Sequence, residues 1–122
     1  MDFELTNTLA TQTGALAWSL VIEASTAAAL ASWTGWGTPG RAAIAAIAGT
    51  LATHGFAWSY VLEHAEVETF ALVVLQVEAT VVVIESLAYR LLVCAPIVRC
   101  LAFSVAANAM SAGFGLLMNG LV

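Results

Sequence analysis

The sequence predicts an all-α integral membrane protein, a bundle of four transmembrane helices with short loops and both termini on the outer side. Of the 122 residues, 61% are hydrophobic and 9% are charged, whereas soluble domains carry about 25% charged residues. The apolar residues fall into four long runs, and a helix needs roughly 20 such residues to cross the hydrocarbon core of a bilayer. The placement of the arginines then sets the orientation.

The four runs form a single domain over residues 1–122, because the connections between them are short. Thr38 followed by Pro39 indicates the start of the second helix, since threonine caps helices and proline suits their first position. An acidic connection at 63–68 and a tight turn at Pro96 separate the later runs. We expect helices at about residues 10–33, 41–62, 69–93 and 97–121.

Charged residues outside the apolar runs predict the topology. The cations Arg41, Arg90 and Arg99 all lie at the first and third connections, and the chain has no lysine. Acidic residues gather on the opposite side, at Asp2, Glu4, Glu63, Glu66 and Glu68. The positive-inside rule makes the two arginine-bearing turns cytoplasmic. An alanine-rich chain with arginine in place of lysine favours a prokaryotic source, so we expect a multi-pass protein of the cell (inner) membrane.

Two classes of function are disfavoured. A net charge of −5 with only 3 cations argues against a nucleic-acid partner, which would be bound through lysine and arginine. Four membrane spans leave no room for a soluble catalytic domain, and the common nucleophile, phosphate-loop and zinc motifs do not occur. We expect a protein that is not an enzyme, with the lipid bilayer and other membrane chains or copies of itself as partners.

Every predicted helix carries polar residues at depth. Residues seven, four or three apart share one helix face, and such faces recur in all four runs. A charged side chain at the centre of a bilayer costs about 2.5–3.5 kcal/mol on insertion scales, so these faces must point inward, towards each other, a partner or water. We take the ion- or proton-path candidates to be Glu23, His54, Glu78, Glu85 and Asn108. Arg99 is the expected charged partner of Glu85, because Arg90 lies off its face.

Two interpretations of this polar seam are open. In the structural one, the polar groups hydrogen-bond to each other and lock the bundle, for about 0.6–2 kcal/mol per contact. In the functional one, carboxyl groups load and release protons or cations, with His54 as a relay. Within the functional interpretation, Glu23, His54 and Glu78 could instead form a metal site, or His54 could ligate a tetrapyrrole pigment. The cofactor is therefore unknown, with a pigment or a lipid left open.

Two further patterns concern packing and thiols. Ala107, Ser111 and Gly115 repeat small residues at a spacing of four, which lets helices approach closely. Cys94 and Cys100 flank Pro96 at a turn expected in the cytoplasm, where thiols stay reduced. Both are expected to be free thiols.

Two families of small membrane proteins share features with this chain. Four helices in 122 residues, with Glu23 in the middle of the first, resemble the small multidrug resistance transporters, which couple substrate exit to proton entry through a helix-one glutamate. The resemblance covers size, helix number and Glu23 alone. Small fluoride channels are similar in size and carry a Gly-Thr-Leu segment, found here as Gly49-Thr50-Leu51. Their asparagine-bearing continuation is replaced by Ala52-Thr53-His54-Gly55, so neither resemblance assigns a further residue.

The expected function is that of a small integral membrane subunit of a larger assembly. The chain would stabilise that assembly and contribute part of a proton or ion path, because it offers little besides its helices for recognition. The alternative is a self-assembling small transporter or channel for protons or cations that uses its intramembrane carboxylates.

Overall fold

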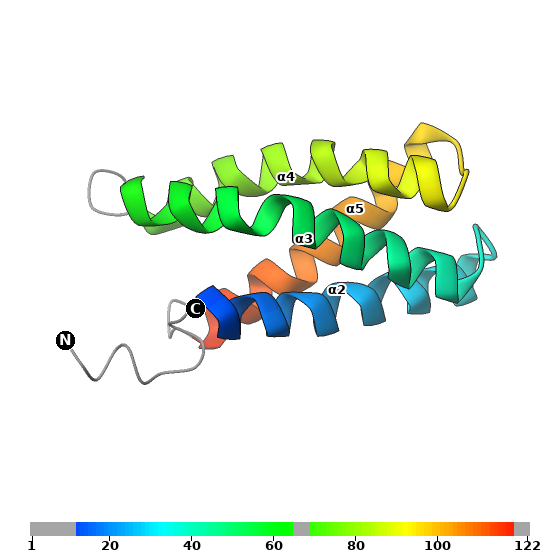
Figure 1. Cartoon of the computed structure of the whole chain (residues 1–122), viewed down its shortest axis with the longest axis horizontal. Helices are drawn as coiled ribbons and strands as arrows, with labels where there is room; N and C mark the ends of the chain where they lie inside the picture. The colour runs from blue at the N-terminus through cyan, green and yellow to red at the C-terminus, as the bar shows by residue number, and fades with distance from the viewer. Residues whose placement is uncertain (1–11, 65–68, 119–122) are drawn as a thin grey trace.

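The computed structural model describes residues 12–64 and 69–118, and these fold into four helices and the turns between them. The helices are α2 (Gln12–Thr34), α3 (Pro39–His64), α4 (Phe70–Leu92) and α5 (Ile97–Met118) (Figure 1). The predicted all-α, four-helix class is confirmed. The expected helix positions at 10–11 and 119–121 lie outside the described residues.

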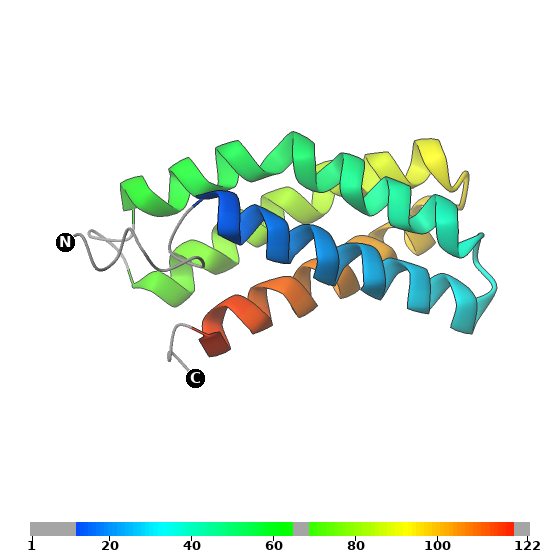
Figure 2. The ribbon, with the colours of Figure 1, turned by 60° about the horizontal axis from the view of Figure 1, so that its bottom comes forward.

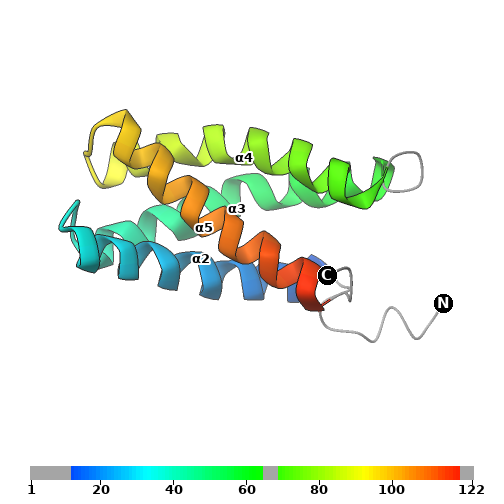
Figure 3. The same cartoon turned by 180° about the vertical axis from the view of Figure 1, so that it is seen from behind.

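The helices are arranged as a ring in which each one packs against two others. α2 contacts α3 and α5, and α4 contacts the same two helices. The start of α2 and the end of α5 lie at one end of the bundle, called here the terminal end (Figures 1 and 2). The turns 35–38 and 93–96 lie at the other, the turn end. α5 runs obliquely, from beside α4 at the turn end to beside α2 at the terminal end (Figure 3).

The two turns at the turn end are held by local hydrogen bonds and by each other. The Arg41 N–H donates to Thr38 Oγ1 at 3.3 Å, so Thr38 caps α3 as its sequence predicts. Gly35 ends α2 with a φ of +71°, a conformation that favours glycine. A Cβ on Gly37 would lie 2.6 Å from Val93 Cγ1, so any larger residue would push the two turns apart.

The surface of the bundle is apolar and its interior is partly polar. Thr13–Thr34, Ala71–Leu92 and Ile97–Met118 are each long and apolar enough to cross a membrane. Large apolar side chains face outward on all four helices, among them Val21, Leu51, Leu75 and Leu117. Among the described residues, seven polar or charged side chains are buried, including Glu23 and Glu85. This distribution suits a multi-pass membrane protein, in which lipid replaces water as the outer solvent.

α3 is not among these three candidate spans, although it is the longest helix at 26 residues. It contains His54, His64 and several glycine, threonine and serine residues, which lower its mean hydropathy. The buried members of this helix are alanine, glycine and threonine. These small residues let α3 pack closely against both α2 and α4, which explains why its composition is less apolar than that of the other helices.

The half of the bundle near the turn end is closed by small and aromatic side chains, and is called here the sealed half. Buried alanines line α2 and α3 at Ala27, Ala31, Ala42, Ala45 and Ala46. Phe103 stacks on Tyr89 with ring centroids 5.2 Å apart and meets Trp36 edge-on at 6.1 Å. Tyr89 belongs to this closed packing, because its side chain is only 1% exposed.

Candidate functional site

Glu23 joins three helices in the middle of the bundle. Its Oε1 accepts a hydrogen bond from Ser111 Oγ of α5 at 2.7 Å. Its Oε2 accepts one from Thr50 Oγ1 of α3. The side chain is buried, and both of its oxygens therefore have a neutral hydroxyl donor.

Glu85 makes the equivalent connection from α4. Its Oε2 accepts from Thr53 Oγ1 at 2.8 Å, and its Oε1 accepts from Asn108 Nδ2 at 2.6 Å. The expected partner, Arg99, instead lies over the Trp36 ring, 5.4 Å from its centroid. That expectation failed because the neutral donors of α3 and α5 reach the carboxyl group at its own depth.

The spacing of these donors explains the pattern. Thr50 and Thr53 are three residues apart on α3, and Asn108 and Ser111 are three apart on α5, so each pair shares a helix face. Each of these two helices gives one donor to the carboxyl of α2 and one to the carboxyl of α4. We call this group the carboxyl–donor cluster, and its members are Glu23, Thr50, Thr53, Glu85, Asn108 and Ser111.

A glycine makes room for this cluster. A Cβ on Gly49 would lie 3.1 Å from Glu85 Cγ and 3.2 Å from Glu85 Cβ. Contacts this short require the neighbour to move. Gly49 therefore lets the Glu85 side chain lie directly against the α3 backbone.

Glu78 differs from the other two glutamates. Its Oε2 is the buried side-chain oxygen that lacks a hydrogen-bond partner in the described part of the chain. Glu78 lies two turns before Glu85 on α4, on the terminal-end side of the carboxyl–donor cluster. It is half-buried and lines both cavities described next.

Two adjacent cavities extend from the carboxyl–donor cluster towards the terminal end. The central cavity, of about 100 Å³, is lined by all six cluster residues together with Glu78 and His54. The terminal cavity, of about 210 Å³, is lined by residues of all four helices. Both are bounded by Ser19, His54, Ala57, Glu78, Ser111 and Ala112, so Glu78 and His54 stand where one cavity meets the other.

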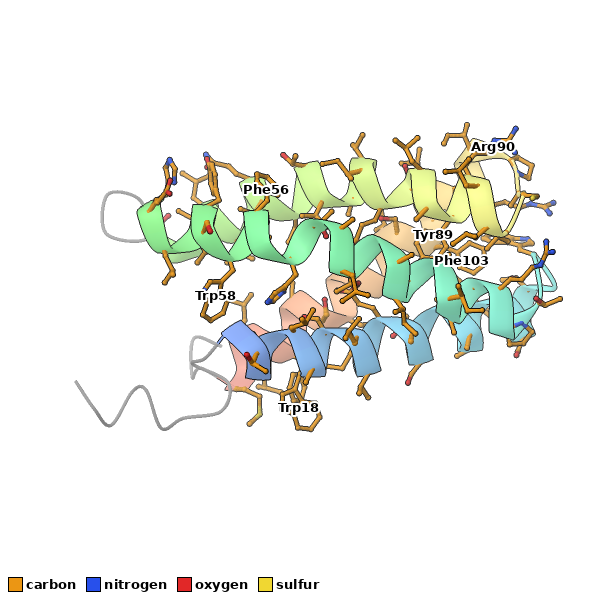
Figure 4. All side chains as sticks on the ribbon, in the orientation of Figure 1. Trp18, Phe56, Trp58, Tyr89, Arg90 and Phe103 are labelled. Atoms are coloured by element: carbon orange, nitrogen blue, oxygen red, sulfur yellow. The ribbon has the colours of Figure 1, made fainter. Side chains whose placement is uncertain are left out.

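Aromatic rings form much of the wall of the terminal cavity. Trp58 belongs to α3 and stacks on His54 at 6.1 Å between ring centroids. Trp18 of α2 and Phe114 of α5 stack on each other at 5.1 Å. Figure 4 shows Trp58 and Trp18 in the half of the bundle near the terminal end, and Tyr89 beside Phe103 in the sealed half. The cavity wall thus combines aromatic rings with the carboxyl group of Glu78, whose Oε2 accepts no hydrogen bond from the described residues.

The structure separates the predicted site residues into two groups. Glu23, Glu85 and Asn108 are joined by hydrogen bonds through shared donors, whereas Glu78 and His54 line the cavities. In the described residues, no group of three or more His, Cys, Asp or Glu side chains is placed to hold a metal ion. The optional metal site of Glu23, His54 and Glu78 is therefore not assembled.

The small residues Ala107, Ser111 and Gly115 of α5 also have different surroundings. Ala107 is buried in the helix packing. Ser111 donates to Glu23, and Gly115 lines the terminal cavity, where a Cβ on it would meet no atom within 4 Å. Within this chain, the stripe of small residues is therefore packed at Ala107 and faces open space at Gly115.

Two residues of the site were missed by sequence reasoning. Thr53 donates to Glu85, and Trp58 forms an aromatic wall of the terminal cavity. Ser19, which shares the polar face of Glu23 in the sequence, lines both cavities. The spacing of Thr50 and Thr53, three residues apart and so on one helix face, could have indicated that Thr53 also faces the polar interior. Trp58 lies near the end of an apolar run, where a tryptophan is typical of a membrane interface, so the sequence did not indicate a place in the site. Comparison of the chain with protein-family models, with curated proteins and with solved structures gave no match.

Proposed function

We propose that this protein spans the membrane four times, with both termini outside, and takes up protons or small cations from the terminal end through Glu78 and His54. The observation that carries the proposal is the buried Oε2 of Glu78, which has no hydrogen-bond partner in the described residues and lies on the wall of both cavities. A self-assembling transporter or channel in the cell (inner) membrane is the function that this geometry supports best.

The contrast among the three glutamates supports this reading. Each oxygen of Glu23 and Glu85 accepts a hydrogen bond from a neutral donor of the fold. A buried polar group without a partner costs about 1–3 kcal/mol. A proton or a cation that arrives through the terminal cavity should therefore stabilise Glu78 more than Glu23 or Glu85, because it gives Glu78 Oε2 the partner that the described residues do not provide.

The fourth span is part of the proposal. A helix of 26 residues is about 39 Å long at about 1.5 Å per residue, which exceeds the roughly 30 Å of a hydrocarbon core. α3 packs between α2 and α4, both of which are candidate spans. The arginines at the turn end support a cytoplasmic position for that end.

A second candidate function rests on the sealed half. Phe103, Tyr89 and the buried alanines close the bundle between the carboxyl–donor cluster and the turn end. A path through a single chain would therefore need this half to rearrange, or a second chain to continue it. This favours the role of a small subunit in a larger membrane assembly, made of other chains or of copies of this one, and not that of an enzyme.

Proton uptake in proteoliposomes tests the main proposal. The purified protein is reconstituted with a pH-sensitive dye inside, and proton entry is driven by a potassium diffusion potential. We expect Glu78→Gln to abolish the flux and Glu63→Gln, at the exposed end of α3, to leave it unchanged. Unchanged flux in both Glu78→Gln and Glu23→Gln would contradict a proton path through this site.

A further inference from the structure

We infer that the terminal cavity binds a small organic ammonium ion with at least one N–H, its nitrogen at Glu78 Oε2 and its alkyl groups against Trp58, Trp18 and Phe114. This inference rests on the proposed function and names the class of cation that the same site would take. The cavity has the three features that such an ion needs, namely an acceptor, aromatic walls and limited size.

The proposed hydrogen-bond acceptor for the ammonium ion is a single oxygen atom, Glu78 Oε2. Glu78 Oε2 is buried and unpartnered in the described part of the chain, so a ligand N–H would replace no hydrogen bond of the fold. A quaternary ammonium ion carries no N–H and cannot satisfy this oxygen. Hydrogen bonds to charged groups contribute more than those between neutral groups, so the site should distinguish the two kinds of cation.

The walls favour a cation over a neutral ligand of the same shape. Aromatic faces attract cations within about 6 Å through their quadrupole, most strongly in tryptophan. Trp58 and Trp18 both line the terminal cavity, and Phe114 stacks on Trp18. Within residues 12–64 and 69–118, no arginine lines either cavity, so none of their guanidinium groups competes with the ligand.

The composition and size of the site argue against other cations. Ca²⁺ and Mg²⁺ take about six or more oxygen ligands, and the described residues hold no cluster of three His, Cys, Asp or Glu side chains for any metal ion. The volume of about 210 Å³ falls below the range of about 300–1,000 Å³ typical of pockets for drug-sized molecules. A monovalent ion with a few carbon atoms fits both limits.

Binding exchanges one cation for another at Glu78. The carboxylic O–H bond breaks, its proton leaves to water in the cavity, and an N–H···O hydrogen bond to the carboxylate forms. Titratable groups facing this site are Glu23 from α2, His54 from α3 and Glu85 from α4, while α5 presents the neutral Asn108 and Ser111. The local charge after exchange equals that before it, so the buried site carries no uncompensated carboxylate.

Isothermal titration calorimetry in lipid nanodiscs tests the inference with three probes of similar shape. tert-Butylammonium carries N–H groups, tetramethylammonium is its isomer without them, and tert-butanol is neutral. We expect tert-butylammonium to bind at least about tenfold more tightly than tetramethylammonium, and tert-butanol to bind most weakly. Equal affinity for the first two probes would overturn the N–H contact, and equal affinity for all three would show an apolar cavity only.

Variants then locate the ligand. Glu78→Gln should weaken tert-butylammonium binding about tenfold or more, while Glu63→Gln should not change it. Trp58→Leu should weaken binding about threefold or more, and Trp33→Leu, at an exposed position of α2 near the turn end, should have no effect. Glu78→Asp keeps a carboxyl group and should retain measurable binding, which separates loss of the acceptor from loss of the fold.

The two proposals fail separately. If tert-butylammonium does not bind the wild-type protein while proton flux still depends on Glu78, the ammonium inference is wrong and the proposed function stands. If tert-butylammonium binds through Glu78 while the proteoliposomes show no flux that depends on this residue, the site is a receptor for the ion and the transport proposal is wrong.

Discussion

The two halves of the bundle are built from similar helices but enclose different interiors. In the sealed half, alanines of α2 and α3 face Tyr89 and Phe103, and the side chains fill the space between the helices. In the half near the terminal end, α5 has moved from α4 towards α2 (Figure 3), and cavities remain. Small residues at an interface thus give a closed core only where the helices also converge.

Thiol labelling should give the largest difference between the halves. In a variant without native cysteines, Ala57→Cys places a thiol beside both cavities, whereas Ala45→Cys places one in the sealed half. A small water-soluble thiol reagent added outside should modify the first and leave the second unmodified, because only the first adjoins open space. Mass spectrometry of the intact protein measures the modified fraction.

Native Cys94 provides the control for orientation in a parallel labelling of the wild-type protein. It is an exposed free thiol in the turn 93–96, and Cys100 is buried. An impermeant reagent should therefore modify Cys94 only in inside-out vesicles. Modification of Cys94 from the outer side would reverse the proposed topology, and equal labelling of the Ala57→Cys and Ala45→Cys variants would show that the halves do not differ.

Removing the aromatic stack should have the next largest effect. Phe103 is fully buried, and Phe103→Ala should lower the free energy of unfolding by about 3–5 kcal/mol, because the surrounding side chains cannot refill the space. Equilibrium unfolding in mixed micelles measures this change. Phe56→Ala, at a 46% exposed position, is the matched control and should cost far less. Similar losses for both variants would contradict a tightly packed sealed half.

Replacing glutamates should separate the cluster from the cavity. Glu85→Leu removes the hydrogen bonds from Thr53 and Asn108 to the carboxyl group, although both donors keep a backbone carbonyl acceptor. It should lower the free energy of unfolding by about 1–3 kcal/mol. Glu78→Leu removes a carboxyl group whose Oε2 has no partner in the described residues, and should leave stability unchanged or raise it. Unfolding in the same micelles compares them, and a larger loss for Glu78→Leu would reverse the assignment of structural and functional carboxyls.

Two glycine substitutions should have the smallest effects, and of opposite sign. Gly49→Ala would push a Cβ against the Glu85 side chain and should destabilise the protein by about 1 kcal/mol or more. Gly115→Ala adds a Cβ that meets no atom within 4 Å, and should stabilise the helix by up to about 1 kcal/mol. Thermal unfolding monitored by circular dichroism measures both, and the same sign for both would show that Gly49 is not a close contact.

The sequence predicted the four helices because hydropathy and turn residues are local properties. It also placed Glu23, Glu85 and Asn108 on inward faces, since a polar group at depth must avoid lipid. It did not predict the pairing of Thr53 with Glu85, which depends on how far α3 and α4 rotate and slide against each other. The stacking of Tyr89 on Phe103 was not predicted for the same reason, because Phe103 belongs to another helix.

The ring order of the helices has a consequence for how the chain can be rearranged. α2 and α5 are neighbours, and the start of one and the end of the other share an end of the bundle (Figure 1). A linker between them would close the polypeptide into a circle without moving a helix. Cutting that circle at the turn 35–38 would move both ends of the chain from the terminal end of the bundle to the turn end.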